Sequence, residues 1–169
     1  MYIALVDDSS EDIRYLFENI SRYCKEHRVH MQIDKFEDEK KFIAAANNRA
    51  YDLVILDIYM KKINGDRIAQ AIREKYPECQ IIFTTASQEH AVKAVKVRAL
   101  DYLVKPYTYE ELETALDHFE EVYNKFLHYI ELKEGRQFTK ILIKDIMYVD
   151  YHNHYIQVHT TSNVVRSYM

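Results

Sequence analysis

Residues 51–60, with the sequence YDLVILDIYM, place the strongest constraint on the fold of this chain. Leu53 to Leu56 form an unbroken apolar run without helical periodicity. A short run of this kind is typical of a strand that is buried on both faces of a sheet. The run ends in a single carboxylate, Asp57. The sequence therefore predicts an acid at the carboxyl end of a central strand, where open α/β sheets bind their ligands.

Strand-like and helix-like segments alternate through the first 125 residues. Further apolar runs predict strands at residues 2–6, 30–36, 80–84 and 101–104. Amphipathic segments predict helices over about 10–27, 39–47 and 66–76, a short one after Ser87, and a long one after Thr108. Ser9 with Asp12, and Thr108 with Glu111, have the spacing of capping boxes at helix starts. This alternation predicts an α/β fold with a doubly wound, five-stranded parallel sheet.

Polar side chains follow these strands at corresponding ends. They are Asp7 and Asp8 after the first strand, Asp57 after the third, Thr85 after the fourth and Lys105 after the fifth. Because the strands are expected to be parallel, these side chains should converge on one edge of the sheet. Three crowded carboxylates repel one another unless a cation neutralises them, and oxygen ligands without His or Cys favour Mg²⁺. A lysine and a hydroxyl beside such an ion are donors suited to a phosphoryl group on Asp57.

Simpler explanations stay open for several of these residues. Asp57 would also fit a solvated position at the start of a loop, and Asp7 with Asp8 would suit the N-terminus of a helix, where the dipole favours acids. Tyr102 would equally fit an ordinary core position. The ordered occurrence of all the strand-end groups is what favours the phosphoryl site.

The segments VDD, LVILDIYM, FTTAS and ALDYLVKP resemble, in this order, the receiver domain of two-component response regulators, over residues 1–125. The resemblance implies a flavodoxin-like fold in which Asp57 accepts a phosphoryl group from a sensor histidine kinase. Such a chain is a self-catalysed phosphoacceptor rather than a turnover enzyme. The implied Mg²⁺ ligands are the side chains of Asp7, Asp8 and Asp57 and the backbone carbonyl of Tyr59. Thr85 and Lys105 would bind phosphoryl oxygens.

The resemblance also implies a conformational switch. After phosphorylation the Thr85 hydroxyl would move toward the phosphoryl group, and Tyr102 would turn inward into the vacated space. Pro106 matches a proline that follows a cis peptide bond in this family. An independent phosphatase that used Asp57 as its nucleophile is a weaker alternative, because it would need an acid where Tyr59 stands.

Residues 126–169 predict a separate, short all-β segment, with strands at 138–143, 146–151, 155–160 and 164–168. The stretch KILIKDIMYVDYHNHYIQVHTTSNVVRSYM resembles the opening of a LytTR-type DNA-binding domain. We expect only the N-terminal part of such a domain here. By the resemblance, His154 is the expected base-contacting residue. A polar hairpin tip carrying solvated histidines is the alternative, and is also a better explanation than a metal site built from His152, His154 and His159.

Two kinds of output remain open from the sequence. One is transcriptional control through DNA binding by the LytTR-like segment, although the net charge of −4 does not indicate a strong nucleic-acid binder. The other is a protein-interaction or dimerisation switch without DNA binding. Unpaired strand edges in an incomplete β segment predict a homodimer formed through this tail. Without a membrane-length apolar run, and with only Cys24 and Cys79, a cytoplasmic location and no membrane partner are expected.

Overall fold

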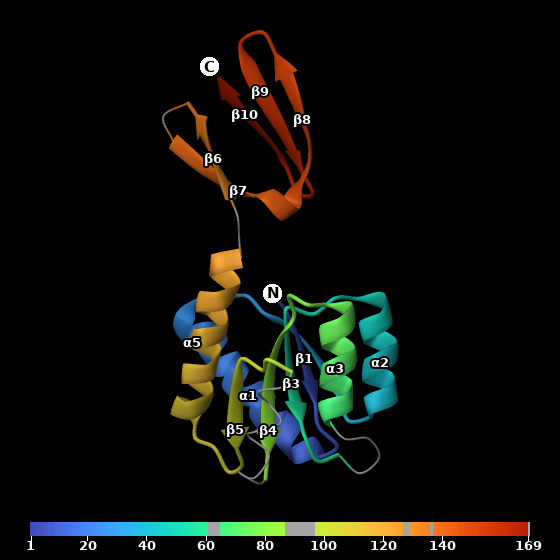
Figure 1. The fold of residues 1–169 in the computed structure, drawn as a ribbon. Helices are drawn as coiled ribbons and strands as arrows, with labels where there is room; N and C mark the ends of the chain where they lie inside the picture. Colours follow the sequence, from blue (N-terminus) through green and yellow to red (C-terminus); the bar gives the residue numbers. More distant parts are fainter. Residues whose placement is uncertain (61–64, 87–96, 127–128, 136, 169) are drawn as a thin grey trace. The chain divides into compact units, whose positions relative to one another are not determined.

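The structure is a computed structural model that describes residues 1–60, 65–86, 97–126, 129–135 and 137–168. The chain divides into two compact units, Met1–Glu120 and Glu121–Met169, which are considered separately below (Figure 1). Within the described residues, no helix combines the length and the apolar character that crossing a membrane requires.

The first unit is built on a five-stranded sheet. Its strands are β1 (Tyr2–Val6), β2 (Gln32–Phe36), β3 (Leu53–Asp57), β4 (Gln80–Thr85) and β5 (Asp101–Val104). They are all parallel and lie in the order β2-β1-β3-β4-β5. β3 is central and every one of its residues is buried, as its unbroken apolar run predicts. The predicted α/β fold class is confirmed.

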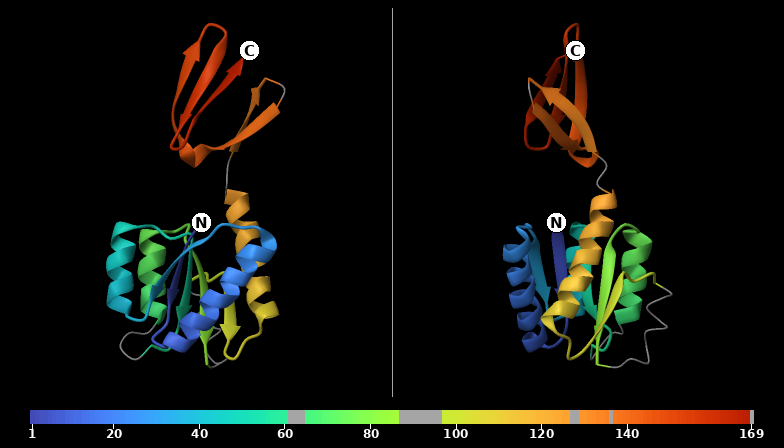
Figure 2. Two further views of the ribbon diagram at one scale, coloured as in Figure 1. Left: turned by 180° about the vertical axis from the view of Figure 1, so that it is seen from behind. Right: turned by 90° about the vertical axis from the view of Figure 1, so that its left-hand side faces the viewer.

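Helices cover both faces of this sheet (Figures 1 and 2). They are α1 (Ser10–His27), α2 (Glu39–Asn48), α3 (Gly65–Lys75) and α5 (Tyr109–Phe126). α1 packs beside α5, where the Tyr23 hydroxyl donates a 2.7 Å hydrogen bond to Asp117. α2 packs beside α3, where the Tyr76 hydroxyl donates to the Ala46 carbonyl at 2.7 Å. The helix predicted after Ser87 begins outside the described residues.

The core consists of two layers, because successive side chains of a strand point to opposite faces. On the α2–α3 face, Val54 and Leu56 of β3 pack against Phe42 of α2 and against Ile68 and Ile72 of α3. The intervening residues of β3 are also fully buried, against the face that α1 and α5 cover. Burial on both faces fixes the position of β3, and therefore of the acid at its end.

Beyond the end of α5, the second unit is built on β-strands, as predicted. Its elements are β6 (Tyr129–Glu134), β7 (Gln137–Leu142), the short 3-10 helix η2 (Ile143–Asp145), β8 (Ile146–His152), β9 (Tyr155–Thr160) and β10 (Val164–Tyr168). β6 and β7 form an antiparallel hairpin, and the other strands form a sheet in the order β10-β9-β8. Leu132, Ile141, Val158 and Val165 make a small core. β6 is absent from the sequence prediction, although its apolar and charged residues alternate as in a half-buried strand.

Candidate functional site

The three carboxylates that the sequence predicts to converge do lie together. Asp7 and Asp8 follow β1, Asp57 ends β3, and these two strands are hydrogen-bonded neighbours. One carboxylate oxygen from each residue lies within 4.8 Å of the others. Asp7 and Asp57 are buried, with 1% and 5% of their surface exposed, whereas Asp8 is half-buried. A set made only of carboxylate oxygens fits a hard divalent cation such as Mg²⁺.

The surroundings of Asp7 and Asp57 disfavour the ionised form of their carboxyl groups. Burial raises the pKa of Asp57 to about 6, and the charges of Asp7 and Asp8 add to the increase. Lys105 and the Tyr59 N–H act in the opposite direction. Burial also raises the pKa of Asp7, although hydrogen bonds from Lys105 and from the Ser9 N–H oppose it. A bound divalent cation would remove this penalty, so the donor set fits the predicted ion.

Lys105 brings a positive charge to the same edge. It follows β5, and its Nζ donates to Asp7 Oδ2 and to Asp12 Oδ2, each at 2.7 Å, while Asp57 Oδ1 lies at 3.7 Å. Burial alone would lower the pKa of Lys105, but the hydrogen bonds to Asp12 and Asp7, together with the charges of Asp7 and Asp57, outweigh it and raise the pKa. The side chain is therefore held as a cation beside the predicted acceptor. The bond between Lys105 and Pro106 is a cis peptide.

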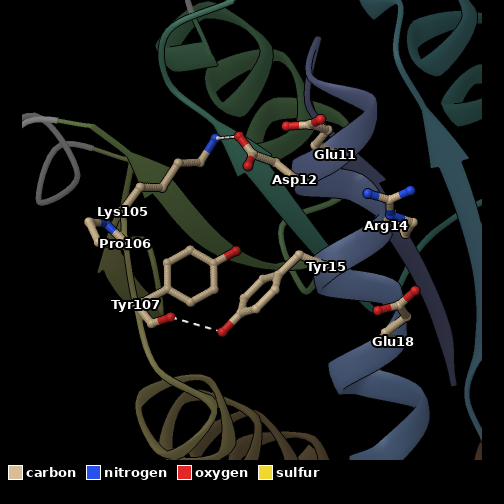
Figure 3. A pocket seen from close by; sticks show the side chains of 8 residues that line it. All are labelled: Glu11, Asp12, Arg14, Tyr15, Glu18, Lys105, Pro106 and Tyr107. Carbon is tan, nitrogen blue, oxygen red and sulfur yellow. Dashed lines mark hydrogen bonds and ion pairs between the residues drawn. The ribbon is translucent and has the colours of Figure 1, made fainter.

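The sequence predicts Asp12 only as part of a capping box, and that prediction is half wrong. Its backbone N–H does donate to Ser9 Oγ at 3.3 Å, so Ser9 caps α1. Its carboxylate, however, binds Lys105 (Figure 3), and the Ser9 N–H donates instead to Asp7 Oδ1 at 2.9 Å. Local sequence spacing gave no signal for this contact, which depends on how α1 packs over the edge of the sheet.

A cavity of about 650 Å³ adjoins this lysine. The start of α1 and residues 105–107 line it, and Figure 3 shows Lys105 extended along one side toward Asp12. Tyr15 and Tyr107 join its two walls, because the Tyr15 hydroxyl donates to the Tyr107 carbonyl at 3.0 Å. The cavity gives a route from the surface toward the lysine.

Thr85 and Tyr102 occupy the positions that the sequence predicts for them. Thr85 is the last residue of β4 and is fully buried, and its carbonyl accepts the Lys105 N–H at 2.7 Å. Tyr102 lies on β5 opposite Phe83 of β4 and is half-buried against the core on the α2–α3 face. This placement also suits a core residue, so the switching role stays a prediction.

The start of α3 approaches the acceptor's backbone closely. The Gly65 N–H donates to the Ile58 carbonyl at 3.0 Å. A Cβ at Gly65 would lie 2.5 Å from the Asp57 carbonyl oxygen and 2.9 Å from Ile58 Cα. Only glycine fits such an approach, and it lets the helix support the segment that carries Asp57 and Tyr59. The Tyr59 side chain is 47% exposed.

His154 lies apart from this site, in the second unit. It is exposed in the turn between β8 and β9, so the predicted hairpin tip is confirmed. His152 stacks on Tyr155, with ring centroids 4.6 Å apart, and His159 lies 3.1 Å from Asp150. Among the described residues, only the Asp7–Asp8–Asp57 group has the geometry of a metal cluster. Base contact by His154 stays a prediction.

Comparison with known proteins identifies the family. Residues 3–117 match the model of the response regulator receiver domain, so the chain belongs to the response regulator receiver family. It is 32% identical over 120 residues to the sensory transduction protein LytR of Staphylococcus haemolyticus, covering 69% of this chain and 44% of LytR. It is 26% identical over 171 residues to LytT of Bacillus subtilis, covering 94% of this chain and 68% of LytT.

These relatives are longer than the chain, which spans about half to two thirds of their length. The similarity to LytT runs through the second unit, which supports the predicted kinship with LytTR-type regulators.

Solved structures have the same fold. The response regulatory domain of mrkE from Klebsiella pneumoniae superposes with a TM-score of 0.67 at 26% identity, covering 74% of this chain and 99% of that one. TrrA from Thermotoga maritima, solved in complex with Mg²⁺ and BeF, gives a TM-score of 0.61 at 29% identity, covering 70% and 97%. The likeness covers nearly the whole of both of those chains and matches the first unit's fold.

The raised pKa of Asp57 leads to a prediction about stability. A folded-state pKa of about 6 against 3.8 means that folding favours the protonated acid. The stability that this preference contributes is present below pH 3.8 and is lost as the pH rises through about 6. At pH 7.5 the buried anion should cost on the order of 2–3 kcal/mol. Asp57→Asn should therefore raise the melting temperature of the metal-free protein by several degrees at neutral pH, but not near pH 4.

Thermal unfolding monitored by circular dichroism at both pH values checks this prediction. Glu18→Gln, which neutralises an exposed acid on α1, is the matched control and should change neither curve. Equal melting temperatures of wild type and Asp57→Asn at pH 7.5 would contradict the electrostatic description of the cluster.

Proposed function

We propose that this receiver domain accepts a phosphoryl group on Asp57, with Mg²⁺, from a sensor histidine kinase of a two-component system. The observation that carries the proposal is the convergence of three carboxylates with Lys105, whose Nζ lies 3.7 Å from Asp57 Oδ1. The similarity to TrrA, solved with Mg²⁺ and BeF, supports the same ion at the same edge of the sheet.

The proposed transfer is a substitution at phosphorus. An Asp57 carboxylate oxygen attacks the phosphorus of a phosphohistidine, the new O–P bond forms as the N–P bond breaks, and the imidazole leaves with the electron pair. Asp7, Asp8 and Asp57, with the Tyr59 carbonyl, would hold Mg²⁺, which when bound neutralises charge on the phosphoryl oxygens. Lys105 donates to one of those oxygens. Catalysis here is positioning and charge neutralisation by groups that the sheet already holds together.

The phosphorylated state would be transmitted by Thr85 and Tyr102. The Thr85 hydroxyl, at the buried end of β4, would turn toward the phosphoryl oxygens. Tyr102, half-buried on the adjacent strand β5, would then move further inward. This couples a local change of charge to the surface around β5 and α5.

Acetyl phosphate labelling tests the acceptor. With Mg²⁺, the wild-type protein should gain one phosphoryl group, seen by intact-mass spectrometry, and chelation of Mg²⁺ should prevent it. Asp57→Asn should remain unlabelled because the attacking carboxylate is gone. Asp101→Asn, at the other end of strand β5 from Lys105, is the matched control and should label like the wild type. Labelling of Asp57→Asn at the wild-type level would disprove the assignment of the acceptor.

For the output we propose DNA binding by the second unit, supported by the similarity to LytT across 94% of the chain. The phosphorylated protein should enrich specific sequences from a pool of random DNA duplexes. His154→Ala should reduce that enrichment, because His154 is exposed at the β8–β9 tip, whereas Ser162→Ala in the next turn should not. If wild type and His154→Ala enrich the same sequences equally, the role of His154 is excluded. If nothing is enriched, the second candidate output is favoured.

The second candidate output is a dimerisation switch, and an exposed strand favours it. β8 lies at an edge of its sheet, and Met147, Tyr148, Val149 and Tyr151 along it have 66%, 52%, 52% and 70% of their surfaces exposed. An apolar edge strand of this kind can pair with the same strand of a second copy. We propose that the homodimer forms through this edge.

Val149→Lys should weaken this homodimer, because a charged side chain on an edge strand opposes pairing. Sedimentation equilibrium should give a dimer for the wild type and a monomer for Val149→Lys at the same concentration. Ser162→Lys, which adds the same charge in an exposed turn, should remain dimeric. A wild-type protein that is monomeric, or a Val149→Lys variant as dimeric as the wild type, would refute this interface.

A further inference from the structure

Lys105 is shared between acids that differ in position and burial. Among the described residues, its ion pairs are with Asp7 and Asp12 at 2.7 Å and with Asp57 at 3.7 Å. Asp7 belongs to the carboxylate cluster and is buried. Asp12 lies outside that cluster, in the first turn of α1, and its side chain is 40% exposed. Of these three acids, Asp12 alone is neither the proposed phosphoryl acceptor nor a member of the proposed metal-ligand set.

The distances show which acids the Lys105 ammonium group hydrogen-bonds in the unphosphorylated protein. A lysine ammonium group has three N–H donors. Two are directed to Asp7 and Asp12 at short hydrogen-bond distances, whereas 3.7 Å to Asp57 exceeds hydrogen-bond reach. In Figure 3 the lysine side chain ends at the Asp12 carboxylate. One N–H donor remains, so a phosphoryl group on Asp57 would share the ammonium group with Asp12 and draw it from the position that Asp12 helps to fix.

We propose that Asp12 is a positioning residue that restrains Lys105 in the unphosphorylated protein and so slows phosphorylation of Asp57. This inference rests on the proposed function of Asp57. Asp12 acts on the reaction through the lysine alone. When the acyl phosphate forms, Lys105 exchanges its bond to Asp12 for one to a phosphoryl oxygen, and Asp12 is released to solvent at the mouth of the cavity.

A purely structural role for Asp12 makes a different prediction. Acids in the first turn of a helix are stabilised by the helix dipole, and Glu11 and Asp12 both occupy that turn. Glu11 is exposed and is not among the ion-pair partners of Lys105. If the charge of the turn were all that mattered, neutralising either residue would have the same effect. If the lysine contact matters, only Asp12 is sensitive.

The test measures the initial rate of labelling by acetyl phosphate with Mg²⁺ for wild type, Asp12→Asn, Asp12→Glu and Glu11→Gln. Loss of a partly exposed ion pair should make Asp12→Asn about two- to fivefold faster than wild type. The difference should shrink in about 1 M salt, where exposed charges are screened. Asp12→Glu restores the charge and should return the rate toward wild type, and Glu11→Gln should leave it unchanged. Thermal unfolding confirms that each variant is folded.

Contact between Asp12 and Lys105 is measured separately by NMR of the protein with ¹³C-methylated lysines. The chemical shift of the Lys105 methyl resonance should change in Asp12→Asn and should not change in Glu11→Gln. An unshifted resonance, a rate for Asp12→Asn at or below wild type, or equal acceleration by Glu11→Gln would overturn the role of Asp12. Failure of the proposed function has a distinct signature, because wild type would then label no more than Asp57→Asn. Equal labelling of wild type and Asp57→Asn would overturn the role of Asp12 too, even if the Lys105 resonance shifts in Asp12→Asn.

Discussion

Three neighbouring carboxylates repel one another at one edge of the first unit's sheet, and this repulsion governs the chemistry of the site. Parallel pairing of β1 with β3 brings Asp7 and Asp8 beside Asp57, and the apolar layers on both sides of β3 bury the acceptor. Packing gains nothing from this arrangement, since a buried acid costs free energy unless a partner offsets its charge. The raised pKa of Asp57 is a direct expression of that cost. A cluster that is unfavourable when empty is one that binds cations well.

Lys105 offsets part of this charge and shows how the fold positions the site. Its backbone N–H binds the Thr85 carbonyl, and the Ile58 N–H binds the Thr84 carbonyl at 3.0 Å, so the segments after β3 and β5 are both fixed to β4. Gly65 then brings α3 against the backbone of Asp57. Each group of the site is the last residue of a strand or lies within two residues of a strand's end. This rigidity is what positioning a phosphoryl group requires.

The strand ends were predictable because apolar runs define strands and parallel strands align their carboxyl ends. The predicted bounds of β5, β9 and β10 match those observed. The partner of Asp12 was not predictable, because local spacing assigned its carboxylate to the Ser9 N–H. The orientation of α1 over the sheet edge, set by tertiary packing, gave it Lys105 instead. The strand β6 was not predicted because only two of its residues, Ile130 and Leu132, face the core, which is too short an apolar pattern to indicate a strand before its pairing with β7 is known.

Whether the three carboxylates form a magnesium site is measured by isothermal titration calorimetry of Mg²⁺ into the metal-free protein at neutral pH. We expect one ion per chain, with binding weakened strongly by Asp8→Asn and weakening progressively as the pH falls below about 6, because the proton taken up by Asp57 in the metal-free protein competes with the ion. Absence of Mg²⁺ binding, or binding that Asp8→Asn leaves unchanged, would show that these carboxylates do not form a metal site. The account of the site would then be wrong.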